Sequence, residues 1–300
     1  MRYKSKKLYA EIGLTDVLTD AGLYRDAWRK LKKNKGAVIS MILLALLILL
    51  AIFGEVIAPY DPAAQDLDNM LQNPSSQYWL GTDQLGRDVL SRVIVGARVS
   101  LSIGLICEAI AVTLGVVLGT CAGYFGGMVD TVISRLIEIL SSFPTVLFAM
   151  AVIFVLGPGV INVFIALGVI GWTSVARIIR GQIMQLKQSE YILAAKATGA
   201  SELSVVCRHL IPNCLSTIIV IVTLDIPACI MTETFLSFIG LGVQPPAPSW
   251  GSMIDTSRKY LRQTPFYALA PGIALMLTVL AFNTLGDALR DALDPRLKNL

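Results

Sequence analysis

The sequence has few charged residues and almost no histidine. Asp, Glu, Lys and Arg make up only 15% of its 300 residues, whereas about 25% is usual in a soluble domain. Hydrophobic residues make up 55%, and the mean hydropathy is +0.67. A soluble protein of this size needs more polar surface, and a net charge of +4 is too small and too dispersed for a nucleic-acid binder. The composition therefore predicts a multi-span membrane protein.

Three further absences limit the chemistry. His209 is the one histidine, so a catalytic triad or a metal site built on several imidazoles is excluded. The five cysteines are odd in number and lack Cys-x-x-Cys spacing, so we expect them to act as small hydrophobic side chains. No Gly-Lys dipeptide occurs, and the chain therefore has no Walker A loop and no ATPase of its own. We predict no catalytic residue and no bound metal.

Long uncharged runs mark the candidate membrane spans. A bilayer core of about 30 Å takes about 20 apolar residues of helix. Residues 36–54 hold no charge, and the uncharged run 139–176 is divided by the Gly-Pro-Gly turn at 157–159. Six transmembrane helices are predicted, at 37–58, about 101–124, 133–156, 160–178 and 213–237, and within 263–286.

Basic residues orient these spans. Of the 25 Lys and Arg residues, 19 lie on one side of the predicted spans: ten before the first span, Arg135 itself, five in the loop 177–211 and three in the tail. By the positive-inside rule, both termini are cytoplasmic. The predicted organisation is a cytoplasmic segment 1–36, a first helix 37–58, an outer loop 59–98, a five-helix core 99–290 with a cytoplasmic loop 177–211 and an outer loop 238–268, and a tail 291–300.

The basic N-terminal segment has helical periodicity. Apolar residues recur at helical spacing over 14–31, with Arg25, Arg29 and Lys30 between them. This pattern suits an amphipathic helix at the inner leaflet, and it suits equally a basic flank that only sets topology.

The cytoplasmic loop 177–211 has the features of an ordered projection. Its composition favours a helix through 183–197, Gly199 permits a left-handed turn, and Ser201 can cap a second helix. Pro212 stands where the chain re-enters the membrane. Small residues near 194–197 would let another protein pack closely, although such a loop can also be a plain connector.

This loop resembles the EAA loop of ABC-importer permeases. Glu190 is followed by an Ala-Ala pair, Gly199 and a Leu-Ile-Pro end. Three residues separate Glu190 from the alanines, which departs from the strict triplet but is the form typical of the peptide and nickel branch. The resemblance implies a coupling helix at 195–203 that seats in a cytoplasmic ATPase, with these residues forming the coupling loop: Glu190, Tyr191, Ala194, Ala195, Gly199, Ala200 and Pro212.

Other segments resemble the same branch in the same order. They read WLGTDQLGRDV from residue 79, ETFLSFIGLGVQPPAPSWG from 233 and DPRL from 294. The resemblance covers the chain beyond about residue 20 and implies an all-α, type I permease fold, as in the C-type permease of dipeptide, oligopeptide and nickel importers of the plasma (inner) membrane. It also implies a second, homologous permease, two ATP-binding subunits that carry ATP and Mg, and an extracytoplasmic substrate-binding protein, with no cofactor on this chain. Peptide is the expected cargo, and nickel or a metal chelate is the alternative.

Two groups of polar residues have roles that the sequence leaves open. The outer motif, which is either a structural staple or a substrate contact, comprises Gly81, Thr82, Asp83, Gly86, Arg87 and Asp88. Four acidic residues fall in predicted spans, where charge is unfavourable. They are candidates for pathway contact or for interhelical bonding: Glu108, Glu138, Asp225 and Glu233. Trp250 is expected to anchor the outer segment at the membrane interface.

Two other classes of protein fit less well. A stand-alone secondary transporter predicts inverted repeats, and residues 37–156 show no convincing similarity to 160–290. An intramembrane enzyme needs a nucleophile with a base or a metal site, and one histidine in a loop offers neither.

Overall fold

A computed structural model describes residues 20–293, with side chains described from Arg25 onward. The first part of the predicted amphipathic helix, residues 14–19, and the DPRL tail lie outside the described residues. Within the described part all regular elements are helices, apart from one isolated bridge between Thr82 and Asp88. The predicted all-α class is therefore confirmed.

Five helices are long and apolar enough to cross a bilayer. They are α3 (Lys35–Ile57), α4 (Val89–Phe125), α7 (Val160–Leu186), α12 (Pro265–Leu293) and the continuous helix Glu202–Phe238, which contains α9 (Glu202–Val205), the π-turn η3 (Val206–Leu210) and α10 (Ile211–Phe238). A sixth span exists only if the bent pair α5 (Gly127–Ser141) and α6 (Thr145–Leu156) crosses as one. The count of six stays a prediction.

The span predicted at 133–156 is not one continuous helix. α5 and α6 meet at an angle of 88°. Pro144 lacks an amide hydrogen and pushes Phe143 away from helical backbone angles, so the helix ends before it and a new one starts after it. The predicted turn at 157–159 is confirmed, because α6 ends at Leu156 and α7 begins at Val160.

Two other boundaries differ from the expectation. α4 begins at Val89, ten residues inside the expected outer loop, because the Asp88 carboxylate caps it by accepting the Ser91 amide at 2.7 Å. The span predicted from about 213 is part of a longer helix, which runs from Glu202 through a π-turn and past Pro212 to Phe238. α4 has 37 residues, about 56 Å, so it reaches well beyond a bilayer core.

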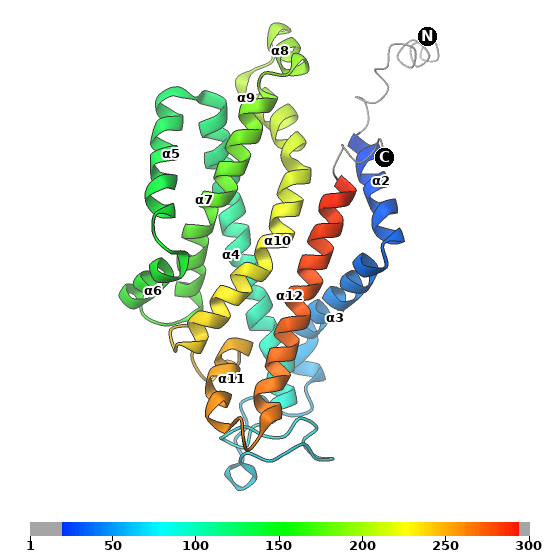
Figure 1. Cartoon of the computed structure of the whole chain (residues 1–300), viewed down its shortest axis with the longest axis vertical. Helices are drawn as coiled ribbons and strands as arrows, with labels where there is room; N and C mark the ends of the chain where they lie inside the picture. Colours follow the sequence, from blue (N-terminus) through cyan, green and yellow to red (C-terminus); the bar gives the residue numbers. More distant parts are fainter. Residues whose placement is uncertain (1–19, 294–300) are drawn as a thin grey trace.

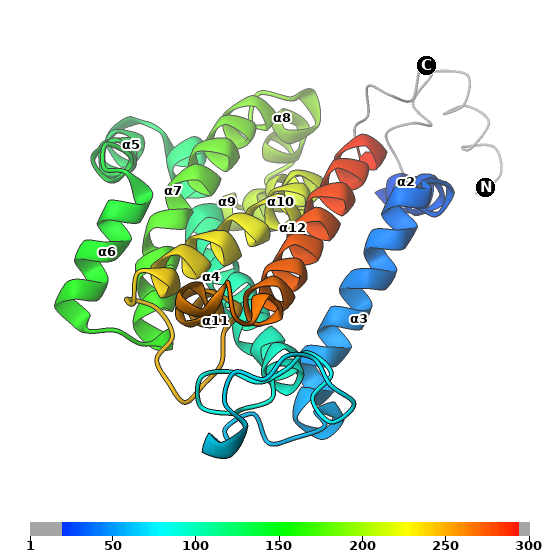
Figure 2. The same cartoon turned by 60° about the horizontal axis from the view of Figure 1, so that its bottom comes forward.

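The short elements gather at the two ends of the helical bundle. Figure 1 shows α2 (Asp20–Lys33), α8 (Glu190–Ala197) and the C-terminal end of α12 at one end of the bundle. At the other end lie α11 (Trp250–Ser257) and the loop that precedes α4. Figure 2 shows α5 and α6 on one flank and α3 with α12 on the other. The two described chain ends therefore lie at the same end of the molecule as α8.

Helix α2 packs against the C-terminal part of α12. Ala27 and Leu31 are buried against Ala288 and Ala292 of α12. Trp28 points outward, with the Lys32 ammonium 5.0 Å from the centre of its ring. Of the predicted apolar face, Leu31 therefore packs on α12 and Trp28 stays exposed.

Helix α4 contacts α7 through a row of glycines that the span analysis missed. Gly115, Gly119 and Gly123 are spaced one turn apart and let the two backbones approach. A Cβ atom on Gly119 would lie 2.6 Å from the Ala176 carbonyl oxygen. The spacing is visible in the sequence, but the partner helix is not.

We expect Gly119→Leu to destabilise the α4–α7 pair. The added side chain has no space, and overpacking of this kind costs about 1–3 kcal/mol or more. The measurement is the thermal unfolding midpoint of the detergent-solubilised protein, which should fall by several degrees. Gly181→Leu is the matched control, since a Cβ atom there meets open space on α7; equal losses in both variants would contradict the packing account.

Candidate functional site

The loop that carries the EAA-like sequence forms two short helices joined by a tight turn. α8 ends in a Schellman cap: the Gly199 amide donates to the Lys196 carbonyl at 3.0 Å and the Ala200 amide to the Ala195 carbonyl at 3.1 Å. Gly199 has φ +87°, a left-handed value that favours glycine. Ser201 then caps α9 by accepting the Ser204 amide. The predicted turn at Gly199 and the predicted cap at Ser201 are both confirmed.

The helix expected through 183–197 is wrong in detail, and the coupling segment expected at 195–203, bent at Gly199, is two short helices. α7 ends at Leu186, and a break at 187–189 precedes α8. The segment 195–203 is the end of α8, the turn and the start of α9.

Two contacts hold α8 on the bundle. Ile192 is fully buried in a cluster with Ile183 and Leu210, which belong to the helices before and after the loop. The Lys196 ammonium lies 4.7 Å from the ring centre of Tyr124, near the end of α4. The interaction with Tyr124 raises the pKa of Lys196. A displacement of α8 would therefore reach α4, α7 and α10 directly.

The opposite face of the loop is exposed and apolar. Tyr191, Leu193 and Leu203 are exposed, with Leu203 at 73%. The small side chains of Ala194 and Ala197 lie between them, also exposed, and Glu190 begins α8 at the surface. Pro212 lies past the loop, in the first turn of α10.

The outer motif closes the loop before α4 around one buried carboxylate. Asp83 is fully buried and accepts from the Arg87 Nε at 2.7 Å and from two backbone amides, those of Leu85 and Arg87. Arg92 is also buried, its Nε lies 3.5 Å from the same carboxylate, and its Nη1 donates to the Pro62 carbonyl at 2.9 Å. Sequence reasoning used Arg92 only as a topology charge and missed this role.

The remaining residues of the motif fix the path of the chain. The Thr82 hydroxyl accepts the Gln72 amide at 2.9 Å. Gly86 approaches Asp66 so closely that a Cβ atom would lie 1.7 Å from its carbonyl oxygen, and Gly81 approaches Gln72 in the same way. With the Asp88 cap, this geometry supports the structural-staple interpretation of the motif.

The segment after α10 packs onto this staple. Trp250 is 1% exposed, and its indole Nε1 donates to the Val93 carbonyl at 3.0 Å. The expectation that it anchors the segment at the membrane interface is therefore wrong. The Tyr267 hydroxyl, which the sequence did not single out, donates to Gln84 at 2.6 Å.

The four acidic residues of the spans have three different environments. Glu138 is exposed beside Arg135, whose Nη1 lies 2.6 Å away. Glu233 is fully buried and accepts the Ser237 hydroxyl at 2.6 Å. Glu108 and Asp225 line one pocket halfway along the bundle.

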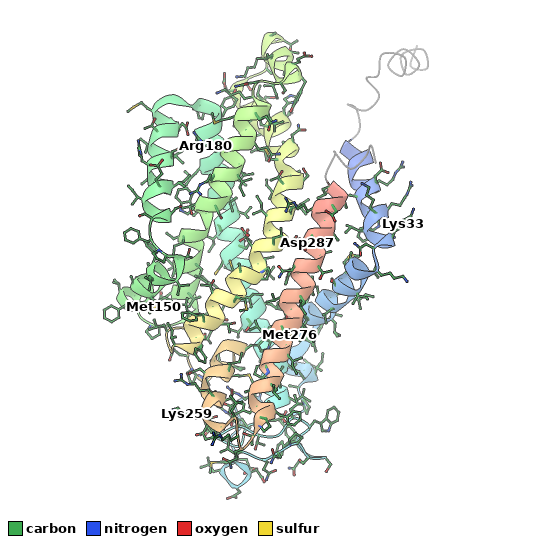
Figure 3. All side chains as sticks on the ribbon, viewed as in Figure 1. Lys33, Met150, Arg180, Lys259, Met276 and Asp287 are labelled. Atoms are coloured by element: carbon green, nitrogen blue, oxygen red, sulfur yellow. The ribbon has the colours of Figure 1, made fainter. Side chains whose placement is uncertain are left out.

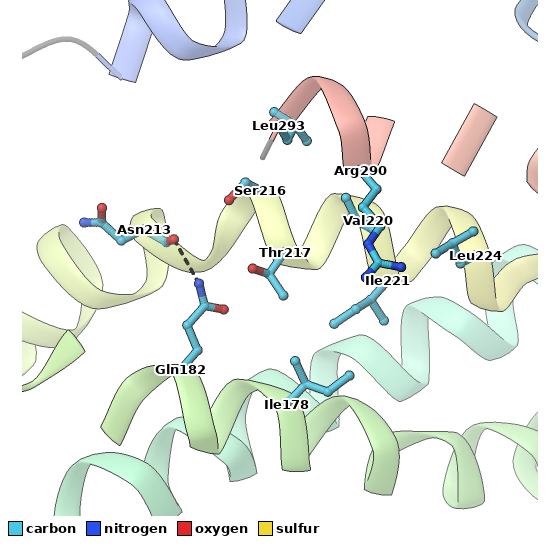
Figure 4. A pocket seen from close by; sticks show the side chains of 10 residues that line it. All are labelled: Ile178, Gln182, Asn213, Ser216, Thr217, Val220, Ile221, Leu224, Arg290 and Leu293. Carbon is cyan, nitrogen blue, oxygen red and sulfur yellow. Dashed lines mark hydrogen bonds between the residues drawn. The ribbon is translucent and has the colours of Figure 1, made fainter. Parts of the chain in front are cut away.

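A larger cavity opens between α7, α10 and α12. It measures about 560 Å³ and is lined by polar and apolar side chains in similar number, among them Gln182, Thr217 and Arg290. Figure 4 shows the Gln182 amide bonded to the Asn213 carbonyl across the cavity, with Arg290 reaching in from α12. In Figure 3, Arg180 marks the end of α7 at which this cavity lies, and Lys259 marks the opposite end of the molecule.

Comparison with known proteins decides the family. Residues 115–299 match the family described as binding-protein-dependent transport system inner membrane component. Residues 22–74 match the N-terminal transmembrane domain of oligopeptide transport permease C. The chain belongs to the ABC-importer permeases.

Relatives of this permease extend over nearly its whole length. It is 40% identical to the dipeptide transport system permease protein DppC of Alkalihalophilus pseudofirmus, over 95% of this chain and 93% of the relative. It is also 40% identical to the glutathione transport system permease protein GsiD of Pectobacterium atrosepticum, over 92% of each. Its fold is similar to a chain of the MetNI methionine ABC transporter in an inward-facing conformation, with a TM-score of 0.54 at 16% identity, over 68% of this chain and 96% of that one.

Proposed function

We propose that this permease forms half of the translocation pathway of an ATP-driven importer for peptides, delivered by an extracytoplasmic binding protein. The names of the dipeptide and glutathione relatives support this cargo. The observation that carries the proposal is the α8–α9 loop, which presents an exposed apolar face on a firmly held base.

The loop is the proposed contact with an ATPase. Two separate ATP-binding subunits hold ATP and Mg and hydrolyse the nucleotide, and this chain binds neither. When they close, they push on Tyr191, Leu193 and Leu203, and Ile192 passes the movement to the packed ends of α7 and α10. Because a packed cluster moves as a unit, the spans rotate against those of a second, homologous permease and open the pathway to alternate sides.

The opposite end of the molecule is the proposed outer face. Beside the staple around Asp83, Trp250 bonds α11 to Val93 of α4, and Tyr267 bonds α12 to Gln84 in the loop before α4. A binding protein that docks there would meet a rigid surface and deliver its cargo to the pathway.

A pull-down from the native membrane in mild detergent tests the proposed assembly. The expected co-purifying chains are a second permease and one or two ATPases with Walker motifs, identified by mass spectrometry and by ATPase activity. A chain that elutes alone, or only as a homo-oligomer, would contradict the proposal.

Topology gives a separate prediction. In a variant that keeps only Cys207, which is exposed beyond α9, a membrane-impermeant thiol reagent should label the protein only after the membrane is opened. With Cys207 removed and Ser76→Cys added in the exposed outer loop, labelling should occur in intact cells. The reverse pattern would overturn the orientation in which α8 and both chain ends are cytoplasmic.

A further inference from the structure

We propose that Glu108 and Asp225 form a binding site for a primary ammonium group halfway through the permease. The inference rests on the proposed function, because the ligand it assigns is the N-terminal ammonium of a transported peptide. It selects two of the four acidic residues in the spans and gives them one role.

The site is a pocket of about 240 Å³ lined by residues of α4, α6, α7 and α10. Glu108 comes from the middle of α4, and Asp225 and Cys229 lie one turn apart in the middle of α10. The Cys229 sulfur lies 4.0 Å from Glu108 Oε2, so the two helices bring residues 121 positions apart into contact.

Glu108 lacks the partners that a purely structural carboxylate would have. Its residue is 2% exposed, and Oε1 has no hydrogen-bond partner among residues 25–293. A buried carboxylate is strongly disfavoured unless a cation or donor meets it. Glu233, which is equally buried, also has one oxygen without a partner among residues 25–293, but its other oxygen accepts the Ser237 hydroxyl and the residue lies outside this pocket. The free oxygen of Glu108 is thus left for a ligand.

Three of the four hydroxyl groups that line the pocket, all but that of Thr145, are set up as acceptors. The hydroxyls of Thr173, Ser174 and Thr232 each donate to a carbonyl of their own helix, at 3.0, 3.1 and 2.8 Å. Their oxygen lone pairs remain for another donor. No Lys, Arg or His lines the pocket in the described part of the chain. A ligand that fits negative charge and hydrogen-bond acceptors must bring positive charge and donors. An ammonium group does so, because it has three donors and no acceptor.

Cys229 provides a reporter inside the pocket. The complete complex is reconstituted in nanodiscs with Cys107, Cys121, Cys207 and Cys214 replaced by serine, and Cys229 is modified with a cationic aminoethyl or an anionic sulfonatoethyl methanethiosulfonate. The cationic reagent should react at least about tenfold faster. Glu108→Gln and Asp225→Asn should each reduce the cation-to-anion rate ratio about threefold or more, whereas Glu138→Gln, a change at an exposed carboxylate, should not.

The ratio of the two modification rates is measured because a change in the acidity of the Cys229 thiol alters both rates equally and leaves their ratio unchanged. Two neutral variants on different helices are used, so that the test still holds if one of them misfolds. Equal rates for the two reagents, or ratios unchanged in both variants, would overturn the ammonium site.

Protection of Cys229 identifies the ligand. A dipeptide without lysine should slow modification at least threefold, and its N-acetylated form should not. If only peptides with a lysine side chain protect, the α-ammonium assignment is wrong, and if the acetylated peptide protects equally, the ammonium site is wrong.

Transport separates this inference from the proposed function. Glu108→Gln and Asp225→Asn should lower ATP-dependent peptide uptake about tenfold without loss of the ATPase subunits. Normal uptake in both variants overturns the site and leaves the proposed function standing. A wild-type complex that takes up no peptide overturns the proposed function, while the reagent ratio still tests the pocket's charge.

Discussion

Replacing Gly199 with proline is expected to abolish peptide uptake and substrate-stimulated ATP hydrolysis while the chain still inserts in the membrane. Proline fixes φ near −65°, whereas Gly199 has φ +87°, and proline also removes the amide that bonds to Lys196. The Schellman cap is lost, and α8 and α9 no longer present one surface. Gly199→Ala should have a smaller effect, because a left-handed alanine costs about 1–2 kcal/mol.

Thr198→Ala is the matched control for this loop. Thr198 is exposed, and its side chain makes one bond, to the Ala195 carbonyl, so uptake should stay near wild type. Uptake and ATP hydrolysis are measured on the assembled complex in proteoliposomes, with insertion checked by extraction and subunit recovery by pull-down. Wild-type uptake by Gly199→Pro would contradict the assignment of the loop to coupling.

Replacing Asp83 with alanine is the second change with a large expected effect. It leaves the buried guanidinium groups of Arg87 and Arg92 without their shared carboxylate. Removing one partner of a buried charge pair costs about 3–5 kcal/mol. We expect low recovery of folded protein, a lower unfolding midpoint and faster proteolysis within the loop before α4.

Glu55→Gln is the control for charge loss at the same end of the molecule. Glu55 pairs with Arg98 at 2.9 Å, but both side chains are more than half exposed. Such pairs contribute about 0–1 kcal/mol, so this variant should resemble the wild type. Equal sensitivity of both variants to protease would contradict the staple.

Structural features that a few adjacent residues determine could be predicted from the sequence, whereas features that depend on distant contacts could not. The turn at Gly199 and the cap at Ser201 arise from a few adjacent residues, and both were predictable. The bend at Pro144 was equally local, but it lies inside an uncharged run, and run length was given more weight. The start of α4 at Val89 was not predictable in the same way, because the burial of Arg92 in its first turns depends on Asp83 in the folded loop.

The candidate sites were predictable as residues but not as arrangements. Glu108 and Asp225 stood out as charges in apolar helices, yet nothing in the sequence paired them rather than Glu138 or Glu233. Their meeting depends on how α4 and α10 pack, which is set by contacts such as Gly104 against Ile230. Trp250 was misassigned for the same reason, since its burial against α4 is a long-range contact.

The most direct test of the central claim is peptide uptake by proteoliposomes that contain this chain with its partner permease, the ATPases and the binding protein. The account predicts uptake of a labelled dipeptide that requires ATP hydrolysis and that is lost with Gly199→Pro, although all subunits remain assembled. Uptake by this chain alone, driven by an ion gradient and indifferent to ATP, would contradict it and identify a secondary transporter.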